Sequence, residues 1–79
     1  MAKCKAEFLV EPFTEGSQGI HVVAAIDAVT AAGLEPEVGP FGTSVEGDPG
    51  VVLPALQQMI DAAIAEGASH ISISTSVTP

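Results

Sequence analysis

The side chains that could do chemistry in this sequence are mostly carboxylates and hydroxyls. Glu7, Glu11 and Glu46 fall in segments where polar and apolar residues alternate, and serines recur at Ser72, Ser74 and Ser76. Carboxylates attract cations and accept hydrogen bonds from amino groups, while hydroxyls both donate and accept. These residue types suit a surface whose carboxylates bind a cation and whose hydroxyls contact amino and ring-nitrogen groups of a ligand.

No pattern in the sequence predicts a catalytic centre. Paired carboxylates can hydrolyse glycosidic bonds, but this chain offers no aromatic cleft for a sugar. No serine lies in a nucleophile elbow, and the glycine-containing turns lack the lysine of a phosphate-binding loop. We therefore expect a protein that is not an enzyme and has no catalytic residue.

Metal binding has little support either. Cys4 is the single cysteine, and His21 and His70 belong to different predicted elements, so neither type supplies a zinc ligand set. Glu11 and Glu46 could face each other on neighbouring strands and reach calcium or magnesium, but no aspartate-rich loop accompanies them. We expect no metal and no cofactor.

The charge balance restricts the possible partners. Ten acidic residues against two lysines, Lys3 and Lys5, give a formal net charge of −8. Phosphate backbones and anionic membrane surfaces both require clustered cations, so we expect neither nucleic acid nor membrane as a partner. The sequence has no apolar run of membrane-spanning length and no signal core, which predicts a cytoplasmic protein. The negative electrostatic field of so acidic a protein favours a cationic ligand.

Length and periodicity predict the elements that must position these side chains. With 79 residues, 47% of them hydrophobic, the chain has room for one domain over residues 1–79. Alternation predicts a strand over residues 6–11. Ser17 is a typical N-cap for a helix that runs to about Ala32, before Gly33. The apolar stripe of that helix would comprise Ile20, Val22, Val23, Ile26 and Val29.

A hairpin is predicted in the middle of the chain. Residues 34–41 favour a strand, and its two prolines remove backbone donors, which is tolerated at the edge of a sheet. A tight turn at Phe41 and Gly42 leads to another strand over residues 43–46.

The second half of the chain continues with a helix and a last strand. Asp48 caps the helix, Pro49 occupies its first position, and Gly67 ends it. Its buried stripe would comprise Val52, Leu56, Met59, Ile60 and Ala63. Strict alternation over residues 70–77 predicts the last strand. The order βαββαβ with right-handed crossovers predicts a ferredoxin-like α+β domain: a four-stranded antiparallel sheet in the order 4-1-3-2, with both helices on one face.

The last strand would be an unprotected edge of this sheet. Its run of isoleucine, serine and threonine has neither charge nor proline to block pairing with another chain. We expect a homodimer or homotetramer assembled through this edge.

Alternation also assigns residues to the two faces of the sheet. The helix side would hold Phe8, Val10, Val38, Val45, Ile71 and Ile73. The opposite, open face would hold Glu7, Leu9, Glu11, Glu37, Ser44, Glu46, Ser72, Ser74 and Ser76. This face is either an ordinary solvated surface or a shallow ligand surface, on which Leu9 with Phe13 or Phe41 would form an apolar floor.

Three segments resemble one known family: Val10-Glu11-Pro12-Phe13, Glu15-Gly16-Ser17 and Gly42-Thr43-Ser44-Val45-Glu46-Gly47. The family comprises small thiamine- or hydroxymethylpyrimidine-binding proteins, long catalogued as a domain of unknown function. In it, the pattern Gly-Thr-x-(Ile/Val)-Glu-Gly forms the third strand and a helix follows. The resemblance covers nearly the whole chain.

This resemblance implies a ferredoxin-like fold, assembly into dimers or tetramers, and binding of the thiamine pyrimidine without known catalysis. Thr43 and Glu46 match the motif and are the positions carried over as ligand contacts. Ser17 also matches, and its hydroxyl could meet a ligand at the helix start, although a plain N-cap explains it equally well. The absence of arginine favours the free vitamin or its pyrimidine precursor over phosphorylated forms.

Two hypotheses from different classes follow. The first is a cytoplasmic protein that binds thiamine or its hydroxymethylpyrimidine moiety for salvage, buffering or delivery. Its candidate ligand contacts are Thr43, Glu46, Ser17, Phe41, Glu11 and Ser74. The alternative is an oligomeric regulatory or structural module with no small-molecule ligand.

Overall fold

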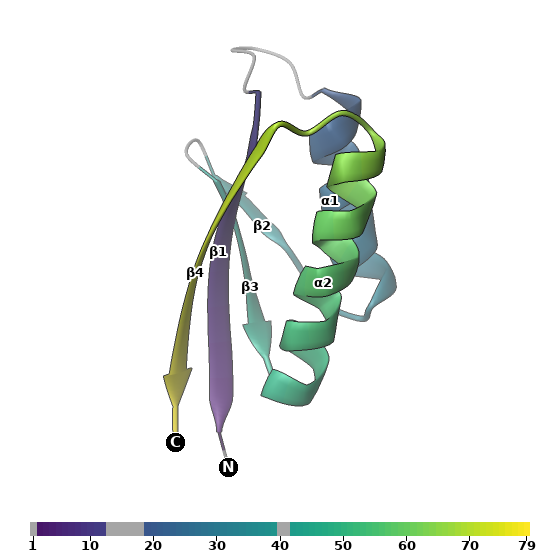
Figure 1. Cartoon of the computed structure of the whole chain (residues 1–79). Coiled ribbons are helices and arrows are strands. Elements are labelled where there is room, and N and C mark those ends of the chain that lie inside the picture. Colours follow the sequence, from purple (N-terminus) through teal and green to yellow (C-terminus); the bar gives the residue numbers. More distant parts are fainter. Residues whose placement is uncertain (1, 13–18, 40–41) are drawn as a thin grey trace.

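The computed structural model describes residues 2–12, 19–39 and 42–79 (Figure 1). The elements in chain order are β1 (Lys3–Glu11), α1 (Ile20–Ala31), β2 (Glu37–Gly39), β3 (Gly42–Gly47), α2 (Pro49–Ala65) and β4 (His70–Thr78). This order confirms the predicted βαββαβ pattern. Among the described residues, no helix is both long and apolar enough to span a membrane.

The four strands form one antiparallel sheet in the order β2-β3-β1-β4, which is the predicted order read from the other end. Both helices lie on the same face of this sheet, and the opposite face carries no helix (Figure 1). The predicted α+β ferredoxin-like architecture is therefore confirmed. The long central strand β1 pairs on both sides, so its residues link the two halves of the sheet.

The two helices begin in different ways. At α2, the Asp48 side chain accepts a 2.7 Å hydrogen bond from the Gly50 amide and Pro49 follows the cap, as predicted. At α1, the N-cap is Gly19, and none of the described side chains caps the helix. Ser17 itself lies outside the described residues. A helix without a side-chain cap leaves its start to be set by tertiary contacts.

The core lies between the helices and the two central strands. Cys4, Ala6, Phe8 and Val10 are the buried residues of β1, at every second position. They pack with Val45 of β3, with Ala25 and Val29 of α1, and with Val52, Ala55, Leu56, Met59 and Ala63 of α2. The predicted helix-side positions Phe8, Val10 and Val45 are confirmed, and the predicted stripe of α2 is buried apart from the half-buried Ile60.

The edges of the sheet are less covered than predicted. Val38 of β2 is 55% exposed and Ile73 of β4 is 37% exposed, although both were placed under the helices. The helices mainly contact β1 and β3, so the outer strands are covered less, although Ile71 of β4 still packs against the core. In α1, Ile20 and Val23 of the predicted stripe are exposed, because Ala25 and Val29 form the buried side of this helix.

The edge strand β2 is also shorter than predicted. It covers only Glu37–Gly39, because Pro36 and Pro40 bracket it and neither can donate a backbone hydrogen bond. Gly39 pairs with Gly42, so the connection to β3 falls on residues 40–41. Phe41, one of the predicted turn residues, therefore lies outside the described part of the chain.

Candidate functional site

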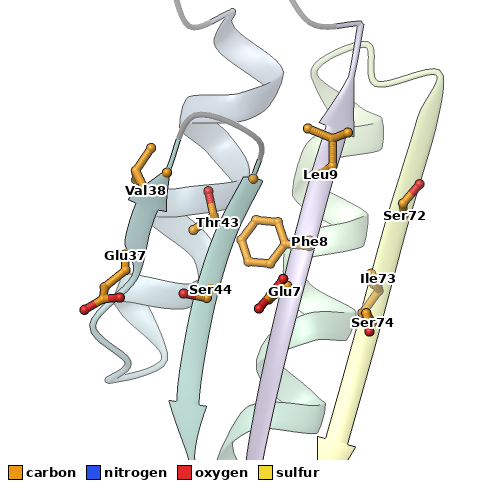
Figure 2. A pocket seen from close by; sticks show the side chains of 12 residues that line it. Glu7, Phe8, Leu9, Glu37, Val38, Thr43, Ser44, Ser72, Ile73 and Ser74 are labelled. Atoms are coloured by element: carbon orange, nitrogen blue, oxygen red, sulfur yellow. The ribbon is translucent and has the colours of Figure 1, made fainter.

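The open face of the sheet carries a depression of about 690 Å³. It crosses all four strands, and Figure 2 looks onto it with the helices behind the sheet. Its lining residues are Glu7, Phe8, Leu9, Glu37, Val38, Gly39, Gly42, Thr43, Ser44, Ser72, Ile73 and Ser74. A volume of this size lies in the usual range for small-molecule sites, roughly 300–1,000 Å³.

One cross-strand row forms the middle of the depression. Glu7 of β1 lies directly opposite Ser44 of β3 and Ser74 of β4, and Ser44 in turn lies opposite Glu37 of β2. Neighbouring strands are about 4.8 Å apart, so Glu7 and Glu37 stand roughly 10 Å apart at the backbone. The row thus presents two carboxylates that are separated by a hydroxyl, with a second hydroxyl on the far side of Glu7.

The next row along the strands has small side chains apart from Leu9. Leu9 is half-buried and lies opposite Ser72, while Gly39 and Gly42 face each other on the hairpin. A Cβ added to Gly42 would stand 2.9 Å from the carbonyl oxygen of Phe8, closer than real Cβ atoms come. The two glycines therefore leave bare backbone beside Leu9, which provides a flat apolar floor next to the carboxylate row.

Positive charge lies outside this depression. The Lys3 ammonium is 3.1 Å from the Glu46 carboxylate, and Lys5 lies directly opposite Glu46 in the strand register. Both lysines precede Glu7 on β1, at the N-terminal end of the open face. Among its described lining residues, the depression has two carboxylates and no cation, so its local field is negative.

A second hollow of about 420 Å³ adjoins the first at the β2–β3 side of the sheet. Its lining includes Lys5, Glu35 and Glu46, and it shares Glu37 and Ser44 with the main depression. Charges of both signs are present here, in contrast to the main depression.

The candidate contact residues are distributed over several places. Ser74 lines the main depression on the open face, and Thr43 also lines it. Thr43, however, is only 5% exposed, and it lies opposite the buried Phe8, which places its side chain on the helix side of the sheet. Glu46 belongs to the second hollow, and Glu11 lies at the far end of β1 opposite His70. Ser17 and Phe41 fall outside the described residues.

The structure contradicts the suggested pairing of Glu11 with Glu46 around a metal ion. Glu46 lies opposite Lys5, six residues before Glu11 on β1, a separation of about 20 Å at ~3.4 Å per residue. The register that places Ala6 opposite Val45 in the core fixes this offset. Among the described residues, no group of three histidine, cysteine or acidic side chains could hold a metal ion.

Two residues at the centre of the depression were not among the candidates. Alternation alone had placed Glu7 and Glu37 on the open face, but nothing in the sequence ranked them above the other acidic residues. Their position in one row follows from the strand register, in which both are aligned with Ser44. A central position on β1 was the one sequence feature that could have drawn attention to Glu7.

His21 makes a structural contact at the start of α1. Its Nε2 atom lies 2.6 Å from the Pro12 carbonyl oxygen, so the ring connects the first turn of α1 to the end of β1. This contact helps to position α1 where none of the described side chains caps the helix.

Comparison with known proteins identifies the family of this chain. The model of a family described as thiamine-binding protein matches residues 6–78, which is nearly the whole chain. No curated protein matches the sequence.

Several solved structures share the fold. A domain of unknown function (DUF77) from Bacillus cereus is 26% identical, with a TM-score of 0.70 over 98% of this chain and 75% of its own. A hypothetical protein from Methanocaldococcus jannaschii is 24% identical, with a TM-score of 0.71 over 100% of this chain and 81% of its own. A proposed thiamine biosynthesis/salvage protein from Thermotoga maritima is 20% identical, with a TM-score of 0.57 over 95% of this chain and 81% of its own.

Proposed function

We propose that this chain, which belongs to the thiamine-binding protein family, binds thiamine or its hydroxymethylpyrimidine moiety without transforming it. The family match over residues 6–78 is the observation that carries the proposal. Such a protein would serve salvage, buffering or delivery of the vitamin in the cytoplasm. The name of the Thermotoga maritima relative, a proposed thiamine biosynthesis/salvage protein, agrees with this role.

The chemistry of the open face supports a ligand of this kind. An aminopyrimidine donates hydrogen bonds from its amino group and accepts them at its ring nitrogens, which suits a mixture of carboxylates and serine hydroxyls. Thiamine also carries a positively charged thiazolium ring, which the negative field of the depression attracts. The floor beside Leu9 gives a flat ring an apolar surface to contact.

Charge also favours the unphosphorylated vitamin. The sequence has no arginine, and Lys3, one of its two lysines, already contacts the Glu46 carboxylate at 3.1 Å. A phosphate group near these lysines would meet Glu46 at the same time, and the net charge of −8 opposes it at longer range. We therefore propose free thiamine or its pyrimidine precursor as the ligand.

The candidate ligand contacts taken from the sequence remain proposals. They are Thr43, Glu46, Ser17, Phe41, Glu11 and Ser74. Ser74 has the strongest support, because it lines the depression beside Glu7. Glu46 has less support as a direct contact because it is already paired with Lys3.

Assembly through β4 also remains a proposal, with new support. All nine residues of this strand pair with β1 on one side only, and the other edge is free (Figure 1). Its helix-side residues Ile73 and Val77 are 37% and 57% exposed. An uncharged strand with exposed apolar residues favours pairing with a second copy into a homodimer or homotetramer.

The exposed edge of β4 is also compatible with the alternative function. An oligomeric regulatory or structural module would use β4 in the same way but would need no ligand on the open face. The two functions differ in one measurable property, which is ligand-dependent stability.

A thermal-shift titration separates them. A ligand that binds only the folded protein raises the unfolding midpoint once its concentration exceeds the dissociation constant. We expect thiamine or hydroxymethylpyrimidine to raise the midpoint progressively, with thiamine diphosphate giving a smaller effect. No shift at millimolar concentrations of either ligand would contradict the binding function and favour the module.

A further inference from the structure

We infer that Glu7 and Glu37 determine the specificity of this site, with Glu7 recognising the aminopyrimidine and Glu37 the cationic thiazolium ring. The inference rests on the proposed function and deepens it, because it names the residues and favours whole thiamine over its pyrimidine alone. Neither residue belongs to the motifs that relate the chain to its family.

The strand register provides the first step. Glu37, Ser44, Glu7 and Ser74 stand in one row across four strands, and all four line the same depression (Figure 2). Glu7 therefore has a serine hydroxyl on each side. A carboxylate flanked by hydroxyls can accept from an exocyclic amino group while the hydroxyls reach the neighbouring ring nitrogens.

Glu37 has a different environment. It lies on the edge strand β2, next to Val38 and Gly39, with Ser44 as its neighbour across the strand. This position offers charge and apolar contact but fewer hydrogen-bonding groups. A ring with a delocalised positive charge needs only that combination, since it has no N–H group to donate.

Spacing links the two carboxylates to one ligand. Their backbones are about 10 Å apart, with Ser44 between them. Side chains that lean inward from both ends can contact two positively polarised groups of a single two-ring molecule. Thiamine has two such groups, the aminopyrimidine and the thiazolium, whereas hydroxymethylpyrimidine has only the first.

Glu66 provides the contrast away from this face. It is an exposed carboxylate at the C-cap of α2, and it lines neither the main depression nor the second hollow. Substituting Glu66 removes the same formal charge as substituting Glu7, so a difference between the two variants reports direct contact rather than the change in net charge.

Isothermal titration calorimetry on the whole chain tests this assignment. The proteins are wild type, Glu7→Gln, Glu37→Gln and, as the matched control, Glu66→Gln, each titrated with thiamine and with hydroxymethylpyrimidine. We expect Glu7→Gln to weaken both ligands roughly tenfold to a hundredfold, the range for losing a hydrogen bond to a charged group. Glu37→Gln should weaken thiamine by about tenfold and hydroxymethylpyrimidine by less than about twofold. Glu66→Gln should change either affinity by less than about threefold.

Three outcomes would overturn the assignment while leaving the binding function intact. They are a loss for Glu66→Gln as large as that for Glu7→Gln, an equal effect of Glu37→Gln on both ligands, and no effect of Glu37→Gln on thiamine. Failure of the wild-type protein to bind either ligand would instead contradict the proposed function itself. Unfolding midpoints measured without ligand confirm that the exposed substitutions leave the fold intact.

Discussion

The two faces of β1 differ in what they contribute to the protein. Its even-numbered residues, among them Phe8, pack under the helices, while its odd-numbered residues, among them Glu7, point to the open face. Neighbouring residues thus serve different purposes: one set holds the sheet to the helices and the other forms the depression. Substitutions on one face should change stability, and substitutions on the other should change binding.

The largest expected effect is a loss of stability, and it follows from a substitution on the face of β1 that the helices cover. Phe8 is 4% exposed and central to the core, so Phe8→Ala should lower the free energy of unfolding by about 3–5 kcal/mol. For a domain this small, such a loss is a large part of the total stability. Chemical denaturation checks it, with Glu7→Gln as the neighbouring control on the open face. A Glu7→Gln variant as unstable as Phe8→Ala would show that the two faces are not separable in this way.

The next largest effect is expected on assembly, at the edge strand β4. Val77 is 57% exposed on the helix side of β4, so Val77→Lys should place charge in the proposed contact between copies and dissociate the oligomer. Val23→Lys, at a 40% exposed position on α1, makes the same chemical change away from β4 and should leave assembly intact. Sedimentation velocity measures both masses.

Two results would contradict assembly through β4. One is a wild-type protein that is monomeric at micromolar concentration. The other is a Val77→Lys variant that keeps the wild-type mass.

The smallest effect is expected at the N-terminal end of the open face. The Lys3–Glu46 ion pair joins two side chains that are 63% and 51% exposed, so Lys3→Met should change the free energy of unfolding by less than about 1 kcal/mol. Denaturation at low and high salt checks this, because an exposed pair weakens as salt rises. A loss well above that size would mean that the pair is part of the structural framework of the face.

The sequence predicted the centre of the fold better than its edges. The helix α2 begins at Pro49 and β4 begins at His70, as predicted, because caps and alternation are local features. The start of α1 at Ile20 could not be predicted, since none of the described side chains caps it and His21 instead contacts Pro12. Exposure of Val38 and Ile73 depends on how far the helices reach across the sheet, which periodicity does not reveal.

The candidate site was predictable only in part. Alternation assigned the carboxylates and serines to the open face, and the family resemblance drew attention to Thr43 and Glu46. The row that joins Glu7 with Glu37 depends on the alignment of two neighbouring strand pairs, and strand register is a tertiary property. The Lys3–Glu46 pair depends on the same register.

The central claim is that thiamine binds on the open face of the sheet. Titrating thiamine into isotope-labelled protein and following backbone amide chemical shifts tests it most directly. We predict that the largest shifts fall on the residues that line the depression, above all Glu7, Ser44 and Ser74, with small shifts across α2. Shifts concentrated on the helices, or no shifts at millimolar thiamine, would contradict it.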